Sequence, residues 1–558
     1  MSPHLGFSAL LGALLATCVV GIAPAHHRNR GSDTGATRII VLNDNGAWSW
    51  FEDERAVVDE TTATLLVSSV ANAHGTGGAS RDGNVEVAAY QLTTNTVQRT
   101  VLHAHLQADD HDSAALYVRP DGRYVAMYST HASDPFTRWR TTLHHRDSAL
   151  WAPESRLDNG APVTYSNMYP TSDGQAKQVL YSFVRSAGRD PHILVSGDDG
   201  ATWTRGGRLL DGPGRPYLRY AADGSERIHV IATEQHPLDY PNRIYHGVIA
   251  HGRLLRSDGT VVDADVLDGV ATTPQRLTQV FAGSAADHAW TIDAQIDRRG
   301  NPYVAFSVHT RPAPHATTPI TGTQAHYYYA RTDGTTWRVY PLAPAGTPLS
   351  EEEPFYTGLV ALDPHDPNHL FISTDIDPRT GAPLVSARDH RRHHELFEGR
   401  SDDGGTTWSW IPLTADSTVD NIRPVVPIWH SDYVALTWLR GTYTTYRNYD
   451  LAVVAVVSKR ERTTCDSHTS DEPADHDGPA RLHSGGSDSL AAPERHRVAR
   501  TGFSALTALS RKQPRGVRGR VIPEKGTQRR DGATKSCRTL TSGASGGGSC
   551  GEQRTERP

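Results

Sequence analysis

The segment QADDHDSAAL, residues 107–116, places a histidine among three aspartates, Asp109, Asp110 and Asp112. Imidazole titrates near neutral pH, and a carboxylate beside it can hold one of its tautomers, so this combination suits general acid–base chemistry. No cysteine is close enough in sequence to suggest a thiolate metal site. In a regular strand Asp110 and Asp112 would face away from His111, so an aspartate that holds the imidazole requires a bend here.

A second histidine is expected beside the first. The segment ALYVRPDGRYVAMYSTH indicates a hairpin with its turn at residues 120–122. His111 and His131 stand about ten residues to either side of that turn, so the hairpin brings them together and both can face one pocket. The alternative for His111 is a structural histidine that bonds backbone at the edge of a sheet.

An arginine and a tyrosine are expected to meet in a similar hairpin. The segment YSNMYPTSDGQAKQVLYSFVR has its turn at residues 172–176, which places either Tyr165 or Tyr169 beside Arg185. The choice between the two tyrosines stays open. The guanidinium fork of arginine matches a carboxylate. The alternative for Arg185 is an exposed side chain at a strand end.

Five further residues are candidates for substrate binding. Arg215 and Arg423 each precede a proline, which favours an extended backbone and can aim the side chain at a central site. With Arg440 they are candidate binders of sulfate or carboxylate groups, although a salt bridge to an aspartate is equally expected for each. His236 and Tyr245 are weaker candidates for the walls of subsites.

The signals for metal binding are weaker. HRRHHE, residues 390–395, resembles a ligand cluster, but such surface loops are usually solvated. Asp375 and Asp377 are residues that bind calcium and also residues that build turns. Cys18 lies near the N-terminus and the other three cysteines lie beyond residue 459, so neither a disulfide framework nor a thiolate zinc site holds the body of the chain. No cofactor is expected, and a structural divalent metal is left open without assigned ligands.

The body of the chain is expected to be all-β. Short alternating runs around Asp-Gly turns recur from about residue 43 to residue 458, as in a series of hairpins. Ser196–Trp203 and Ser401–Trp408 both fit S-x-D-x-G-x-T-W, and a degenerate third copy ends at Trp337. This octapeptide resembles the Asp-box, a structural turn of β-propellers. At roughly 50 to 60 residues per blade, the length predicts a seven-bladed β-propeller, with eight blades as the alternative.

The two ends of the chain differ from this body. An apolar stretch followed by Ala23 and Ala25 predicts a signal peptide, residues 1–25, and hence secretion. The stretch lacks a preceding Lys or Arg, so a buried helix or a lipoprotein signal is the alternative. No later stretch approaches the ~20 apolar residues of a membrane span. Residues 459–558 are rich in Ser, Gly and Arg with Phe503 as their sole aromatic, and are predicted to be disordered.

Several segments together are similar to BNR-repeat propellers that include ulvan lyases of polysaccharide lyase families PL24 and PL25. The segments include GAWSWFEDERAVV (46–58), DDHDSAAL (109–116), YSNMYP (165–170), GRPYLRY (214–220) and TEQHPLDYPNRIYHG (233–247). Similar segments follow in order across the rest of residues 43–458, which the resemblance identifies as a catalytic propeller domain.

The resemblance implies a secreted, monomeric lyase that cleaves an anionic, uronic-acid-containing polysaccharide, such as ulvan or a similar rhamnose-uronate polymer, by β-elimination. It pairs His111 with His131, makes Arg185 the group that neutralises the sugar carboxylate, and makes Tyr169 a base or an acid. Residues 1–458 hold 37 Lys and Arg against 50 Asp and Glu, so local arginines must overcome a repulsive field. No nucleic-acid or membrane partner is expected.

Two other functions remain as alternatives. A sialidase-like glycoside hydrolase would need paired carboxylates or another nucleophile, for which Glu351 to Glu353 and Asp53 are available, but the usual Arg-Ile-Pro opening is absent. A non-catalytic glycan-binding propeller would keep Trp and Arg in its funnel and would not depend on His111 or His131.

Overall fold

The computed structural model describes residues 38–52, 55–172, 178–212, 214–222, 226–310, 325–430 and 433–460. The predicted signal peptide, the alternative carboxylate Asp53 and nearly all of the predicted tail lie outside these residues. Every described residue belongs to one compact unit, Met1–Ser467. None of the helices found among the described residues is long and apolar enough to cross a membrane.

The first three blades are regular four-stranded antiparallel sheets. Blade 1 consists of β2 (Ala56–Asp59), β3 (Thr64–Val70), β4 (Val85–Gln91) and β5 (Thr96–His103). Blade 2 consists of β6 (Ala115–Val118), β7 (Tyr124–Tyr128), β8 (Phe136–Thr141) and β9 (Ser155–Asp158). Blade 3 consists of β10 (Thr164–Ser172), β11 (Gln178–Arg185), β12 (Pro191–Ser196) and β13 (Thr204–Arg208).

The next three blades include one enlarged sheet. Blade 4 consists of β14 (Leu218–Ala222), β15 (Arg227–Ala232), β16 (Ile244–Ala250), β17 (Arg253–Arg256), β18 (Val261–Asp263) and β19 (Thr278–Phe281), which pairs with β16. Blade 5 consists of β20 (Asp287–Ile296), β21 (Pro302–Thr310), β22 (Ala325–Thr332) and β23 (Trp337–Pro344). Blade 6 consists of β24 (Val360–Leu362), β25 (His369–Thr374), β26 (Glu395–Arg400) and β27 (Ser409–Pro412).

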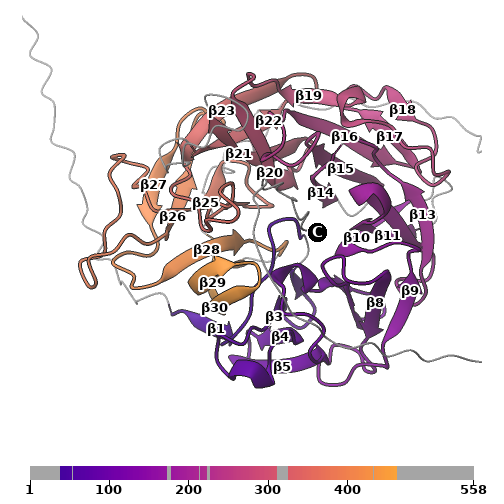
Figure 1. Cartoon of the computed structure of the whole chain (residues 1–558), viewed down its shortest axis with the longest axis horizontal. Coiled ribbons are helices and arrows are strands. Elements are labelled where there is room, and N and C mark those ends of the chain that lie inside the picture. Colours follow the sequence, from indigo (N-terminus) through magenta and orange to yellow (C-terminus); the bar gives the residue numbers. More distant parts are fainter. Residues whose placement is uncertain are drawn as a thin grey trace, which may run out of the picture. The chain divides into compact units, whose positions relative to one another are not determined.

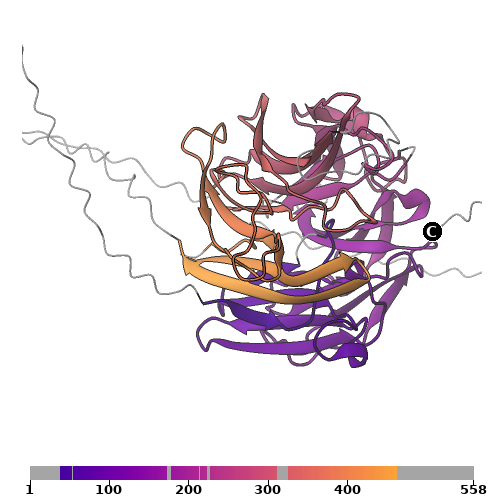
Figure 2. The same ribbon diagram turned by 60° about the vertical axis from the view of Figure 1, so that its left-hand side comes forward.

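The last blade joins the two ends of the described chain. It consists of β28 (Asp420–Val425), β29 (Tyr433–Thr445), β30 (Asn448–Lys459) and the first strand, β1 (Ile40–Asn43). β1 pairs antiparallel with β30, so that Ile40 lies opposite Ala455, and the long orange hairpin β29–β30 lies against the indigo strand in Figure 2. This pairing closes the ring without leaving an unpaired strand in the last blade.

The seven sheets surround a common centre, as Figure 1 shows. The structure therefore confirms the prediction of an all-β, seven-bladed propeller. Helical structure among the described residues is limited to four single 3₁₀ turns: η1 (Gly78–Ser80), η2 (Asp110–Asp112), η3 (Ala187–Arg189) and η4 (Pro274–Arg276).

The repeated octapeptides build matching turns between the third and fourth strands of blades 3 and 6. Asp198 Oδ1 accepts the amide N–H of Thr202 at 2.8 Å, and Asp403 Oδ1 accepts that of Thr407 at 2.9 Å. The tryptophan that ends the first octapeptide, Trp203, is buried and donates its indole N–H to the carbonyl of Gly200. These aspartates and tryptophans hold turns, as expected from the sequence.

The segment that joins β1 to β2 fills the centre of the ring, where an indigo loop reaches inward in Figure 1. Trp50 donates its indole N–H to the carbonyl of Thr291 in blade 5, and its own carbonyl accepts a hydrogen bond from Arg219 in blade 4, both at 2.8 Å. Its ring stacks on Trp290 with centroids 4.7 Å apart, and Phe51 packs on Tyr217 at 4.3 Å. This central segment ties blades from opposite parts of the sequence together.

Trp50→Ala is expected to destabilise the propeller by ~4 kcal/mol, because it removes a fully buried indole and leaves a cavity at the point where several blades meet. Urea unfolding followed by tryptophan fluorescence and far-UV circular dichroism measures the change. Ile411→Ala, at a side chain that is 53% exposed, serves as the control and should cost under ~1 kcal/mol. Equal effects of the two substitutions would contradict a stabilising role for the central segment.

Candidate active site

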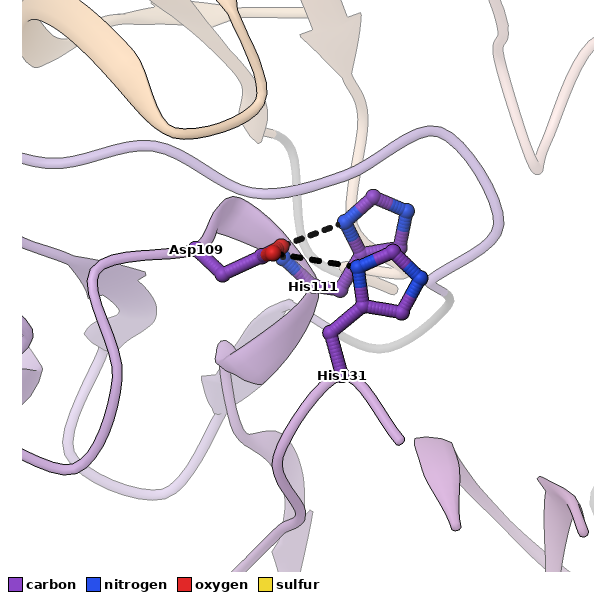
Figure 3. A group of neighbouring side chains, drawn as sticks. All are labelled: Asp109, His111 and His131. Carbon is purple, nitrogen blue, oxygen red and sulfur yellow. Dashed lines mark hydrogen bonds and ion pairs between the residues drawn. The ribbon is translucent and has the colours of Figure 1, made fainter. Parts of the chain in front are cut away.

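His111 and His131 stack on each other at one end of blade 2. Ala115 pairs with Met127 in the β6–β7 hairpin, and the same register continued outward sets residue 111 opposite residue 131. The two imidazole rings lie 3.9 Å apart at an angle of 14° (Figure 3). The hairpin prediction for this pair is therefore confirmed. His111 is buried, whereas 20% of the His131 side chain is exposed.

A bend before β6 turns Asp109 toward both rings. Asp109 has an extended backbone and caps η2, because its Oδ1 accepts the backbone N–H of His111 at 3.1 Å. The segment is thus not a regular strand, and the bend that the sequence analysis required is present. Asp109 Oδ1 lies 2.7 Å from His111 Nδ1, and Asp109 Oδ2 lies 3.0 Å from His131 Nδ1 (Figure 3). Since a carboxylate only accepts, each Nδ1 must carry a proton.

The two histidines carry different charges. Burial alone would lower the pKa of His111, but the charge and hydrogen bond of Asp109 raise it to about 10, so His111 is a cation at neutral pH. Burial and the positive charge of His111 lower the pKa of His131 to about 4, so His131 is neutral. The two imidazoles hold the pKa of Asp109 well below its usual range despite its burial.

The position of Arg185 independently indicates a neutral His131. Arg185 Nη2 lies 3.3 Å from His131 Nε2. A guanidinium can only donate, so Nε2 must present a lone pair, and the single ring proton of His131 lies on Nδ1. Arg185 Nη1 also donates to the hydroxyls of Tyr217 at 3.1 Å and Tyr165 at 3.5 Å. A cavity of about 30 Å³ adjoins these three side chains, which is room for a group about as large as a water molecule.

The structure places Tyr165, and not Tyr169, beside Arg185. In the β10–β11 pair Thr164 lies opposite Arg185, while Tyr169 lies opposite Tyr181. A bulge between Thr164 and Asn167 gives Tyr165 a φ of 67° and re-aims its ring, and the Arg185 guanidinium sits 4.8 Å from that ring. The assignment of Tyr169 to the catalytic group is corrected accordingly.

Tyr169 instead belongs to the core between blades 3 and 4. Its ring packs near Phe183 and Tyr220, and its hydroxyl donates to the carbonyl of Tyr220 at 3.2 Å. This geometry makes Tyr169 a packing residue.

Arg423 lies inside the protein, with no exposed surface. Its backbone is left-handed, with φ 52°, and not extended as the following proline had suggested, and its amide donates to the carbonyl of Gly358. The side chain is fully buried, donates to Asp110 Oδ2 at 2.7 Å and to the carbonyl of Trp48, and lies over the ring of Tyr443. The prediction that Arg423 binds substrate is corrected: it balances the buried charge of Asp110.

Arg215 and His236 lie near Arg185, with His236 next to the acidic residue Glu353. His236 Nδ1 accepts the amide of Leu238, so its Nε2 carries the proton, and this atom lies 3.7 Å from Glu353 Oε2. Burial and the charge of Arg215 keep the pKa of His236 well below its usual value. Arg215 is 30% exposed and lies 3.6 Å from Asp239. The structure thus gathers these two predicted binding residues near Arg185, whose charge acts on His236.

Two other predicted binding residues lie away from the histidine pair. Tyr245 is buried in blade 4, where its hydroxyl donates to Glu234 Oε1 at 2.8 Å. Arg440 is exposed on β29, opposite Asn421. Neither side chain contacts His111, His131 or Arg185 in the described part of the chain.

Several residues of the cleft escaped the sequence analysis. Tyr446, in the turn between β29 and β30, sets its ring edge-on to both histidines, with centroids 5.3 Å from His111 and 5.5 Å from His131. Arg447 Nε lies 3.0 Å from Asp109 Oδ2. These residues belong to blade 7, more than 300 positions away, and only ring closure brings them to blade 2. Tyr217 accepts a hydrogen bond from Arg185. The only indication of it in the sequence was its position directly after Arg215 and Pro216.

Asp109, His111 and His131 are also a group whose ligand atoms lie within 4.8 Å of one another, as in a metal site. Two imidazoles and a carboxylate suit zinc, iron or manganese. Here both carboxylate oxygens are hydrogen-bonded, and the guanidiniums of Arg447 and Arg185 flank the group. Such positive surroundings disfavour a divalent cation.

The other predicted metal candidates also have protein partners. Asp375 accepts the amide of Thr347 and pairs with Arg392, while Asp377 pairs with Arg379 at 2.8 Å. In residues 390–395, His393 Nε2 lies 2.8 Å from Asp389, and His394 Nδ1 lies 3.7 Å from Asp420. Through these contacts the residues stabilise turns and loops.

The resemblance to BNR-repeat propellers is confirmed by comparison with known proteins. Residues 76–345 match the model of a protein family that is described as BNR repeat-containing family member. One similar solved structure is described as a polysaccharide lyase of family PL25, an ulvan lyase bound to -[GlcA(1-4)Rha3S]-. It is 13% identical over 75% of this chain and 96% of its own, with a TM-score of 0.52. Polysaccharide lyase Uly1 is 10% identical over 76% of this chain and 99% of its own, with a TM-score of 0.51.

At these identities the two structures establish the shared fold, and the seven-bladed propeller is the class to which the chain belongs. No curated protein sequence matches it. The chemistry of the cleft therefore has to be argued from its own residues.

Asp109→Asn is expected to destabilise the protein by ~3 kcal/mol at pH 7, because the substitution removes a buried anion from its charged hydrogen-bond partners. The amide also cannot accept from both imidazoles through two equivalent oxygens. Urea unfolding measures the loss. Asp121→Asn is the control: Asp121 pairs with Arg123 at a partly exposed site, so that substitution should cost less than ~1 kcal/mol. A stable Asp109→Asn variant would show that the shared carboxylate is not essential to the pair.

Proposed function

We propose that the chain is a polysaccharide lyase that cleaves a uronic-acid polymer by β-elimination. One observation carries the proposal: a cationic His111 and a neutral His131 share Asp109 directly beside the guanidinium of Arg185. Elimination next to a carboxylate needs a fixed positive charge, a base that is unprotonated at working pH and a proton donor. Arg185, His131 and Tyr165 can supply these three groups, and Arg185 lies within 3.5 Å of both other residues.

Arg185 binds the sugar carboxylate. The cationic His111, which stacks on His131, adds a second positive charge nearby. A guanidinium can pair with both oxygens of a carboxylate and keeps its charge. Neutralising that group lowers the cost of the negative charge that develops when the adjacent carbon, C5, loses its proton. Tyr165 and Tyr217 hold Arg185 through their hydroxyls, so the fork is oriented before substrate arrives.

His131 is the base. Its Nε2 carries the lone pair, and its side chain is the more exposed of the two histidines. When the sugar carboxylate takes over Arg185, Nε2 is released to accept the proton from C5. The electron pair of the C5–H bond forms the C4=C5 double bond as the C4–O4 bond breaks. Asp109 stabilises the resulting imidazolium of His131 through Nδ1.

Tyr165 is the acid that protonates the departing O4. Burial, outweighing the effect of Arg185, raises the pKa of Tyr165 well above its ordinary value, so the hydroxyl stays protonated at neutral pH. The hydroxyl lies 3.5 Å from Arg185 Nη1, within reach of a sugar held by that arginine. After the step the proton on His131 returns to Tyr165 through solvent, and both residues regain their starting forms.

The substrate class follows from the same arrangement. A cleft with Arg185, Arg215 and cationic His111 favours an anionic sugar, and no organic or redox cofactor is needed for the steps above. The similar PL25 structure is described with a glucuronate–sulfated rhamnose chain, which supports a rhamnose-uronate polymer as the substrate here. We further propose that this protein is secreted and acts as a monomer.

Incubation of the full chain with ulvan is expected to raise ultraviolet absorbance near 235 nm, roughly where an unsaturated uronate absorbs. Arg185→Ala should lower kcat/KM by about 10³-fold or more, because transition-state charge is left without its partner. The exposed Arg253→Ala serves as the charge-matched control and should keep wild-type rates. New reducing ends without absorbance would instead favour hydrolysis, and wild-type turnover by Arg185→Ala would remove Arg185 from the mechanism.

The pH profile is expected to identify the base. His131 loses its proton at about pH 4, so kcat/KM should fall only as the pH drops toward that value. His111→Gln removes the neighbouring cation, so the pKa of His131 should rise, and the acid limb of the residual activity should move upward by at least about one pH unit. Histidine-selective ¹³C NMR measures the same pKa without turnover. An unshifted limb together with a shifted NMR pKa would exclude His131 as the base.

A further inference from the structure

A cavity of about 340 Å³ lies between the outer turns of blades 5 and 6, well apart from the histidine pair. Its volume is within the range of small-ligand sites, roughly 300–1,000 Å³. It is larger than the 30 Å³ space that Tyr165, Arg185 and Tyr217 help to line. Three arginines, Arg299, Arg331 and Arg338, and the ring of Tyr340 contribute to its lining.

This cavity opens on the opposite face of the propeller from the histidine cleft. Tyr165 lies at the start of the first strand of its blade and Arg185 at the end of the second, so the cleft lies where first strands begin. The cavity is formed at the turn after β20, where a first strand ends, and at turns between third and fourth strands. Antiparallel geometry puts those turns on the other face.

The acidic groups of the cavity already accept hydrogen bonds from their own turns. Asp297 accepts the amides of Arg299 and Asn301, each at 2.8 Å. Asp333 accepts the amides of two threonines, which lower its pKa to about 2, and Asp403 has the partners described above for its octapeptide. These carboxylates are built into the turns as acceptors.

The arginines of the cavity, in contrast, have guanidinium N–H groups that are not engaged in hydrogen bonds within the described part of the chain. The side chains of Arg299 and Arg338 make no hydrogen bond or ion pair within the described part of the chain, and both residues are exposed. Arg331 is half-buried, and the one hydrogen bond described for its guanidinium is that from Nη1 to Asn368 Oδ1 at 3.2 Å. The cavity therefore offers guanidinium forks that match planar or tetrahedral oxyanions. Tyr340, half-buried, adds an apolar wall with a polar tip.

We propose that this cavity is a second, non-catalytic binding site for an oxyanion-bearing sugar of a polysaccharide chain, held by Arg299, Arg331 and Arg338. The three aspartates offset the charge of the arginines, so recognition depends on paired hydrogen bonds and not on a net positive field. A sulfated or carboxylated sugar supplies those acceptors. A polymer bound here keeps further repeats at high local concentration around the propeller. The site does not depend on the lyase chemistry of the other face.

The test is affinity electrophoresis of the full chain through gels that contain ulvan. Every protein carries Arg185→Ala, so that the catalytic cleft contributes little retention. Adding Arg299→Gln and Arg338→Gln together is expected to weaken retention by roughly tenfold or more, since two charge-assisted contacts are lost. The matched control adds Arg253→Gln and Arg388→Gln, which make the same change in net charge at exposed positions outside the cavity.

Retention that falls only in the Arg299/Arg338 variant, with an unchanged urea unfolding midpoint, supports the site. Equal weakening in the control variant would show bulk charge attraction and overturn it, as would undiminished retention in the cavity variant. A gel of desulfated, carboxyl-reduced ulvan should not retain the parent protein. Retention of equal strength on that neutral polymer would overturn oxyanion recognition.

Discussion

The cleft depends on one carboxylate that is shared between two imidazoles. Asp109 accepts a hydrogen bond from each Nδ1–H, and its burial keeps water from competing for those hydrogen bonds. One anion can fully compensate one imidazolium, so two stacked rings 3.9 Å apart do not both stay charged. The more buried ring, His111, lies beside both Asp109 and Asp110 and keeps the charge, and the outer ring is left neutral with a lone pair. A fixed cation and an available base thus arise from one interaction.

The propeller supplies this interaction by converging segments that are distant in sequence. A short hairpin in blade 2 brings the rings together, whereas Arg447 reaches Asp109 from blade 7 only because β1 and β30 close the ring. Behind the rings, the segment between β1 and β2 contacts several blades and so fixes their relative positions. Two residues of this region, Tyr165 and Arg423, have left-handed φ values at bulges in first strands.

The sequence was sufficient for features that follow from local periodicity. Alternating hairpins and their spacing predicted seven blades, and counting outward from one turn paired His111 with His131. It was insufficient wherever a bulge breaks the alternation of the strand. The bulge after Thr164 places Tyr165, and not Tyr169, beside Arg185. Arg423 lies at the bulge after Ile422 and is buried. Contacts that depend on ring closure, such as those of Tyr446 and Arg447, carry no local signal. The bend that aims Asp109 was required by the argument, but strand geometry could not choose among the three aspartates.

The charge of the cleft has to be understood against the charge of the whole domain. Residues 1–458 are net negative, so long-range attraction would not draw the proposed anionic polymer to this protein, and its recognition would have to come from contacts shorter than the Debye length of ~8 Å. The neighbouring buried acids could cancel the cations, yet burial and the charge of Asp109 raise the pKa of Asp112, while Asp110 is paired with Arg423. The positive charge of Arg185, whose hydrogen-bond partners are neutral, therefore remains uncompensated, whereas that of His111 is balanced by Asp109. In the proposed reaction a sugar carboxylate supplies the missing anion, and by occupying Arg185 it frees the lone pair of His131, so that binding of the substrate carboxylate prepares the base.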